Sequence, residues 1–176
     1  SREWLGKPGS VGRAMGGARL RILVDAGREV QAGEVGPIYV RQPAYPDFTY
    51  NTNPPARAAL ERDGLWSVGD MGYVDAEGYL YIADRKSDMV ISGGVNIYPA
   101  EIEAALHGMP GVADCAVFGI PDAEFGEALC AAVQPRDGVT LDALSVQDYL
   151  KGKIANYKIP RTVTFHEALP REDSGK

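Results

Sequence analysis

A carboxylate between glycines and an arginine between two apolar segments are the residues best suited to hold a nucleotide. Asp70 lies in the run Val-Gly-Asp-Met-Gly, and a carboxylate can accept two hydrogen bonds from the hydroxyls of a ribose. Arg85 carries a planar guanidinium that suits phosphate or ribose oxygens. Each also has a simpler interpretation, since Asp70 is typical of a turn and Arg85 can pair at the surface with Asp84 or Asp88.

Glycines further along the chain suit a passing ligand and a tethered cation. Gly93 and Gly94 lack side chains, so a ligand can approach them closely, although the pair equally suits a bulge or a tight turn. Lys176 follows Ser174 and Gly175, and a lysine on such a tether can bring positive charge to a developing anion. A polar terminal tail is the simpler interpretation of these last residues.

The composition is that of a globular chain with a core. Of 176 residues, 45% are apolar and 24% are charged, and the formal net charge is -6. This charge argues against nucleic acid as a partner, and no apolar run is long enough for a transmembrane segment. Two histidines and two cysteines without ligand spacing argue against a metal site. Cys115 and Cys130 lie in apolar runs, which favours buried free thiols in a reducing, cytoplasmic compartment and leaves one disulfide open.

The first half of the chain is predicted to be rich in strands. A short helix is expected over residues 54–62, before Asp63 and Gly64. Strands are expected where apolar runs or alternating patterns are bounded by turn residues, at 18–24, 35–40, 79–83 and 88–92.

The second half alternates helices with strands. A helix is expected from Pro99 to Gly108, with a buried face of Ile102, Ala105 and Leu106 at helical spacing. A second helix is expected to begin at a capping box over residues 145–148 and to run through Ile154. Further strands are expected at 112–120, 127–134 and 161–165. The pattern predicts an α+β fold with a joint near residues 84–88.

Taken in order, the motifs resemble the adenylate-forming acyl-CoA synthetase superfamily. They lie at residues 64–70, 78–88, 91–103 and 169–176, with connecting pieces at 8–13, 33–36, 119–122 and 157–160. The resemblance covers essentially the whole chain and implies two steps. A carboxylic acid, expected to be a fatty or related acid, attacks the α-phosphate of ATP to give an acyl-adenylate. The thiol of coenzyme A then displaces AMP.

Family members have a large N-terminal domain and a small C-terminal lid that rotates between the steps. The resemblance implies that residues 1–84 are the β-rich end of the large domain and that 85–176 are the lid. Magnesium accompanies ATP, and its ligands are expected outside these residues. The partners are therefore small molecules: the acid, ATP and coenzyme A.

The resemblance also implies roles for three residues at the nucleotide. Asp70 would hold the ribose hydroxyls, Ile82 would pack near the ribose, and Arg85 would contact ribose and phosphate. The usual Arg-Thr-Gly-Asp motif reads Ser-Val-Gly-Asp here, so a threonine hydroxyl is absent.

Four further residues receive roles in the lid. Ser87 occupies the hinge position, where relatives often carry Asp or Lys. Gly93 and Gly94 would lie along the path of pantetheine, and Lys176 would be the catalytic lysine that stabilises charge during adenylation.

A glycine-, serine- and threonine-rich phosphate loop and a Tyr-Gly-x-Thr-Glu motif, both expected upstream, are absent from the sequence. The chain is therefore predicted to be a C-terminal fragment that is inactive alone. Two alternatives stay open: a fragment of an amino-acid-activating adenylation domain, and a non-catalytic module that binds a nucleotide or a protein.

Overall fold

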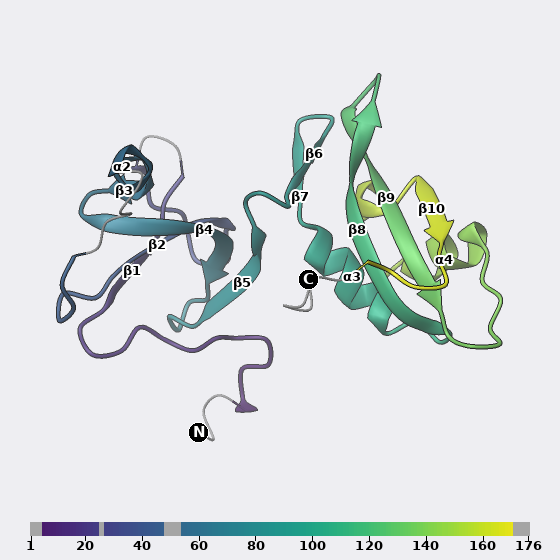
Figure 1. Cartoon of the computed structure of the whole chain (residues 1–176). Helices are drawn as coiled ribbons and strands as arrows, with labels where there is room; N and C mark the ends of the chain where they lie inside the picture. The colour runs from purple at the N-terminus through teal and green to yellow at the C-terminus, as the bar shows by residue number, and fades with distance from the viewer. Residues whose placement is uncertain (1–4, 25–26, 48–53, 171–176) are drawn as a thin grey trace. The chain divides into compact units, whose positions relative to one another are not determined.

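The chain folds into two compact units, each with its own sheet (Figure 1). The computed structural model describes residues 5–24, 27–47 and 54–170. The division falls between Ser87 and Asp88, inside the range 84–88 in which the sequence pattern predicts a joint. Strands with a few helices make an α+β fold, as predicted. Among the described residues, no helix is long and apolar enough to cross a membrane.

An antiparallel sheet forms the first unit, together with the short helix α2 (Pro54–Leu60). Its strands are β1 (Arg19–Ile22), β2 (Gly36–Arg41), β3 (Glu61–Arg62), β4 (Leu65–Val74) and β5 (Leu80–Arg85). The order is β1-β2-β4-β3, with β5 also paired to β4. The predicted helix over 54–62 is thus shorter than expected, because its last two positions form β3.

The longest strand of this unit, β4, was not predicted as a strand. Glycines at 69 and 72 interrupt the apolar alternation that would have indicated it. Gly72 is required by packing, since a Cβ there would lie 2.3 Å from the backbone oxygen of Tyr81 and 2.8 Å from Cδ1 of Ile38. The absence of a side chain therefore lets β2, β4 and β5 come close together.

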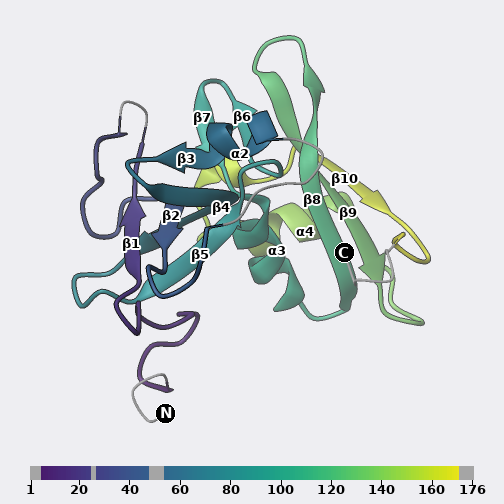
Figure 2. The ribbon, with the colours of Figure 1, turned by 60° about the vertical axis from the view of Figure 1, so that its left-hand side comes forward.

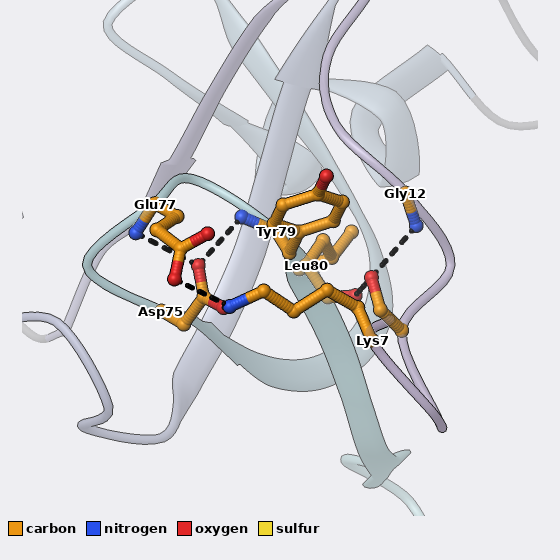
Figure 3. Close-up of polar contacts among 7 residues, drawn as sticks. Lys7, Gly12, Asp75, Glu77, Tyr79 and Leu80 are labelled. Atoms are coloured by element: carbon orange, nitrogen blue, oxygen red, sulfur yellow. Dashed lines mark hydrogen bonds and ion pairs between the residues drawn. The ribbon is translucent and has the colours of Figure 1, made fainter. Parts of the chain in front are cut away.

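A segment near the N-terminus runs along β5 (Figure 3). The amide of Val11 donates to the carbonyl of Leu80 at 2.9 Å, and the amide of Leu80 donates to Gly12 at 2.8 Å. The Ser10 hydroxyl donates to the same Leu80 carbonyl and accepts from the amide of Gly12. We call residues 7–13 the strap, because they pair with β5 on the edge that β4 leaves open.

An ion-pair cluster fastens the strap to the β4–β5 turn (Figure 3). Lys7 Nζ lies 2.8 Å from Asp75 Oδ2 and 2.7 Å from Glu77 Oε1, and 5.2 Å from the centre of the buried Tyr79 ring. Hydrogen bonds to Asp75 and Glu77 raise the pKa of Lys7. The hydrogen bond from Lys7, together with amides of the turn, lowers the pKa of Asp75.

The second unit is built around the strand β9 (Gly126–Pro135). The other strands are β6 (Val90–Ser92), β7 (Val95–Ile97), β8 (Val112–Asp122) and β10 (Thr162–Phe165). The helices are α3 (Pro99–His107), α4 (Ala143–Leu150) and the short 3-10 helix η2 (Asn156–Lys158). β9 pairs antiparallel with β8 and β6 and parallel with β10.

Helices α3 and α4 cover one face of the β8–β9 pair (Figure 2). Ile102 and Leu106 are fully buried there and Ala105 is partly buried, which confirms the predicted buried face of the first helix. Cys115 and Cys130 are buried free thiols, so the disulfide alternative is wrong. Burial raises the pKa of Cys130.

The start of α4 differs from the prediction. Its N-cap is Asp142, whose carboxylate accepts the amide of Ser145 at 2.8 Å, while the Ser145 hydroxyl accepts the amide of Asp142. Ser145 thus occupies the N3 position of the box and is not its N-cap. The helix ends at Leu150 instead of Ile154, two residues before Gly152 with φ +77°.

Candidate functional site

A β-bulge brings the predicted nucleotide-binding residues to one face of the first sheet. Asp70 lies opposite Arg85 and Gly72 lies opposite Ile82, and the register shifts between these pairs. In a regular strand, residues three apart such as Ile82 and Arg85 point to opposite faces. The extra residue of the bulge, Ala83, restores both to the face that Asp70 shares.

Burial supports this shared face. Ile82 and Arg85 are the two exposed residues of β5, and Ile82 is 50% exposed despite its apolar side chain. Met71, on the opposite side of β4 from Asp70, is buried. An exposed isoleucine beside a carboxylate and a guanidinium offers apolar surface as well as polar contacts.

Asp70 and Arg85 form a loose ion pair. Arg85 Nε lies 3.7 Å from Asp70 Oδ1, which is longer than a hydrogen bond, and the two side chains are 57% and 26% exposed. Such a pair contributes about 1 kcal/mol or less and constrains neither group tightly. The carboxylate can thus accept, and the guanidinium can donate, hydrogen bonds to a ligand.

The simpler interpretation of Asp70 as a turn residue is wrong, because the residue lies in a strand. Gly69, with φ +89°, precedes it, and the Gly69 carbonyl accepts the amide of Lys86 at 2.7 Å. Asp84 accepts the backbone amide of Arg85, and Arg85 Nε lies 3.7 Å from Asp70 Oδ1.

Ser87, expected at the hinge, is the last residue of the first unit. Its role in a rotation stays a prediction.

The two glycines of the second unit form a hairpin turn between β6 and β7. Gly93 and Gly94 have φ +58° and +79°, the left-handed pair that a tight hairpin requires. The strand β7 was not predicted, although a tight turn was one of the two interpretations of the pair. A Cβ on Gly94 would meet no atom within 4 Å, whereas one on Gly93 would lie 3.0 Å from the Phe125 ring.

A pocket of about 330 Å³ lies beside this turn, within the second unit. Gly93 and Phe125 line it on one side, and Tyr157 and Arg161 come from the chain between α4 and β10. The Arg161 guanidinium stacks 4.2 Å above the Phe125 ring. Aromatic and apolar walls with one cation can therefore accept a slender ligand that carries negative charge.

The loop before β9 shapes this pocket. Asp122 Oδ1 accepts the amides of Phe125 and Glu124, each at 2.9 Å, and these bonds lower the pKa of Asp122. Sequence reasoning did not single out Phe125 or Arg161, because nothing in their local pattern shows that distant segments bring them together. Residues 157–160 were quoted only as a connecting piece.

Lys176, the predicted catalytic lysine, lies outside the described residues, as do Ser174 and Gly175. The described part of the chain holds no group of three or more His, Cys, Asp or Glu side chains placed to bind a metal ion.

Comparison with known proteins places these features in a family. Residues 101–176 match the AMP-binding enzyme C-terminal domain. The indoleacetate–CoA ligase of Aromatoleum aromaticum is 47% identical over 97% of this chain and 33% of its own length. The long-chain-fatty-acid–CoA ligase FadD13 of Mycobacterium tuberculosis is 39% identical over the whole chain and 34% of its own length.

A solved structure agrees. The o-succinylbenzoate CoA synthetase MenE of Bacillus subtilis, in complex with its acyl-adenylate intermediate, superposes with a TM-score of 0.90 at 36% identity. The match covers 99% of this chain and 35% of that one. The α+β fold is thus that of an AMP-binding enzyme. The chain belongs to the adenylate-forming acyl-CoA synthetase superfamily, and it spans about a third of the length of these relatives.

Proposed function

We propose that the chain is part of an AMP-forming ligase that joins a carboxylic acid to coenzyme A. In the first step, an acid oxygen attacks the α-phosphate of ATP, giving an acyl-adenylate and pyrophosphate. In the second, the coenzyme A thiol attacks the acyl carbon, giving a thioester and AMP. The bulge that gathers Asp70, Ile82 and Arg85 on one exposed face is the observation that carries the proposal.

These three residues divide the binding of the nucleotide. The Asp70 carboxylate accepts hydrogen bonds from both ribose hydroxyls. The guanidinium of Arg85, on the neighbouring strand, donates to ribose and phosphate oxygens. Ile82 packs its exposed side chain against the ribose.

The glycine turn of the second unit serves the thioester step. Because Gly94 has open space where a side chain would point, the pantetheine arm can pass there. Gly93 borders the pocket of Phe125 and Arg161, whose cation suits the phosphates of coenzyme A. Residues 1–84 then end the large domain, 85–176 form the lid, and Ser87, near the start of the lid, is the hinge residue.

Lys176 supplies positive charge to the adenylation transition state. The Mg²⁺ that accompanies ATP would have its protein ligands outside these 176 residues.

Similar relatives act on chemically different acids by their names, indoleacetate, long-chain fatty acids and succinylbenzoate among them. The candidate residues of this chain are assigned to the nucleotide and to coenzyme A, so they do not select the acid. We still predict that the acid is a fatty acid and that the reaction takes place in the cytoplasm.

The test is pyrophosphate release from ATP by the full-length protein that contains this chain. A panel of indoleacetate, a long-chain fatty acid and o-succinylbenzoate supplies the acid, and acyl-CoA is measured after addition of coenzyme A. Pyrophosphate release and thioester formation with at least one acid are expected. Failure with every acid contradicts the function.

A second arm uses the 176-residue chain alone. It is expected to be inactive, because transition-state stabilisation needs the phosphate loop that its sequence lacks. Turnover by this chain alone would contradict its assignment as a fragment.

A further inference from the structure

We infer that Glu127 is a positioning residue for the thioester-forming step, because its carboxylate holds the β6–β7 hairpin that carries Gly93 and Gly94. This inference rests on the proposed function, and it adds a residue that touches neither substrate.

The backbone ladder between β6 and β9 is short. β6 has three residues, and only Ser92 pairs with β9, opposite Gly126. At the turn itself, the amide of Gly93 donates to the carbonyl of Phe125 at 2.9 Å. The backbone contacts between β6 and β9 are therefore confined to the turn end of the hairpin, while Val90 and Ile97 pack into the core at its other end.

Glu127 supplies the next contact where the ladder stops. The following backbone pair would be Ile91 opposite Glu127, but the Ile91 amide instead donates to Glu127 Oε2 at 2.8 Å. A side-chain carboxylate thus replaces the missing ladder bond. A bond to an ionised acceptor is about twice as strong as a neutral one.

The surrounding packing confines this carboxylate. A Cβ on Gly119 of β8 would lie 2.8 Å from Glu127 Oε1 and 3.1 Å from Cγ1 of Val90. Gly119 therefore makes the room in which the carboxylate lies between β8 and β6. Val90 is buried in the core beside it, so β6 is held at both its apolar and its polar side.

Loss of the carboxylate would let the turn shift against the pocket of Phe125 and Arg161. A displacement of about 1 Å at a reacting group can cost about a hundredfold in rate. The turn serves coenzyme A and not ATP in the proposed mechanism. Only the thioester step should therefore suffer.

The experiment compares Glu127→Ala with Glu127→Gln in the full-length protein. Glu103→Ala is the matched control, because Glu103 Oε1 also accepts a backbone amide at 2.8 Å, that of Val117, away from the hairpin. Three quantities are measured: pyrophosphate release, acyl-CoA formation from supplied acyl-adenylate, and hydrogen exchange of the peptide over residues 90–95.

Glu127→Ala is expected to lower kcat/KM for coenzyme A about tenfold or more, with adenylation changed less than about twofold. It should also speed exchange over residues 90–95. Glu127→Gln should restore most of both, since its amide oxygen still accepts the Ile91 amide. Glu103→Ala should leave the ratio of the two half-reactions as in the wild type.

Equal losses in both half-reactions, unchanged exchange, or the same pattern in Glu103→Ala would overturn the role of Glu127. If Glu127→Ala does not fold, Glu127→Asp gives the same test by shortening the reach of the carboxylate while keeping its charge. A wild-type protein that makes neither adenylate nor thioester would contradict the proposed function, while the exchange result would still decide whether Glu127 holds the hairpin.

Discussion

The two hairpins that carry the candidate site are held in different ways. The β4–β5 hairpin has five cross-strand pairs, is paired to β2 through β4, and has the strap along its other edge. The β6–β7 hairpin has three pairs and reaches β9 through the pair of Ser92 with Gly126, the backbone hydrogen bond from Gly93 to Phe125 and the Glu127 carboxylate. The position of the β4–β5 hairpin is fixed by many backbone hydrogen bonds, whereas the position of the β6–β7 hairpin depends on a few residues.

Their glycines differ in the same sense. Gly72 of β4 has no space for a methyl group, so it serves packing. Gly94 has open space around it and a left-handed backbone, so it is required by the turn and not by packing. The first hairpin is thus closely packed around its glycine, whereas the second has open space around its glycine.

The largest effect is expected from Lys176, and it should distinguish adenylation from thioester formation. Lys176→Ala in the full-length protein should slow adenylation about a hundredfold or more, because a charge that acts only in that transition state is lost. Thioester formation from supplied acyl-adenylate should change far less. Equal damage to both steps, measured by single-turnover kinetics, would contradict a role confined to adenylation.

Arg85→Ala tests whether the first hairpin holds the nucleotide. Losing charged hydrogen bonds to ATP should raise its KM about tenfold or more, while the free energy of unfolding hardly changes because the pair with Asp70 is loose and exposed. Arg21→Ala is the control, since Arg21 forms a similar exposed pair with Glu29 at 3.8 Å. A KM for ATP that rises equally in both variants would break the assignment.

Exchanging glycine for alanine in each hairpin sharpens the contrast. Gly72→Ala should lower the free energy of unfolding by about 3 kcal/mol, because its methyl group would meet the Tyr81 backbone. Gly94→Ala should cost only about 1 kcal/mol for its left-handed backbone, yet slow the thioester step. Denaturant titration and the two half-reaction rates check both. Similar unfolding losses would erase the distinction.

The smallest expected effect concerns the strap and its pH dependence. The folded-state pKa of Asp75 is lowered, so its stabilising contribution is present above the ordinary value of 3.8 and is lost as the pH falls below it. The pKa of Lys7 is raised, so its contribution is present below 10.5 and is lost only in strong alkali.

Lys7→Met removes the largest cause of the Asp75 shift. The melting temperature at pH 7 should therefore fall, and its further fall between pH 5 and pH 3 should be smaller than in the wild type. Lys151→Met, which breaks an exposed pair with Asp148, is the control and should change neither. An unchanged acid slope in Lys7→Met would show that amides of the turn alone hold Asp75.

The sequence predicted elements whose signal is local. The helix α3 followed from Pro99, Gly108 and its apolar spacing, and β8 and β9 from predominantly apolar runs. β4 was not predicted because its glycines interrupt the apolar pattern, and Gly72 is needed only for packing against neighbouring strands. β7 was not predicted because a strand of three residues is too short to show an alternating pattern. The capping box of α4 begins three residues earlier than predicted, because Asp142 is the N-cap and Ser145 is its N3 partner. Asp and Ser are both favoured N-cap residues, so the sequence alone does not decide which of them begins the helix.

The candidate site follows the same rule. Asp70, Ile82 and Arg85 were found through motif order, but the bulge that turns them to one face arises only when β4 and β5 pair. The closeness of Glu127 to Gly119 could not be predicted from the sequence. The two residues lie on neighbouring strands, β9 and β8, and the carboxylate fits there because Gly119 has no side chain.

The buried thiols of the second unit have a practical consequence. Cys115 and Cys130 are 2% and 4% exposed, and burial keeps the Cys130 thiol protonated at neutral pH. A disulfide reagent would therefore leave both cysteines of the native chain unreacted. A rise in reactive thiols on heating would report the opening of this core.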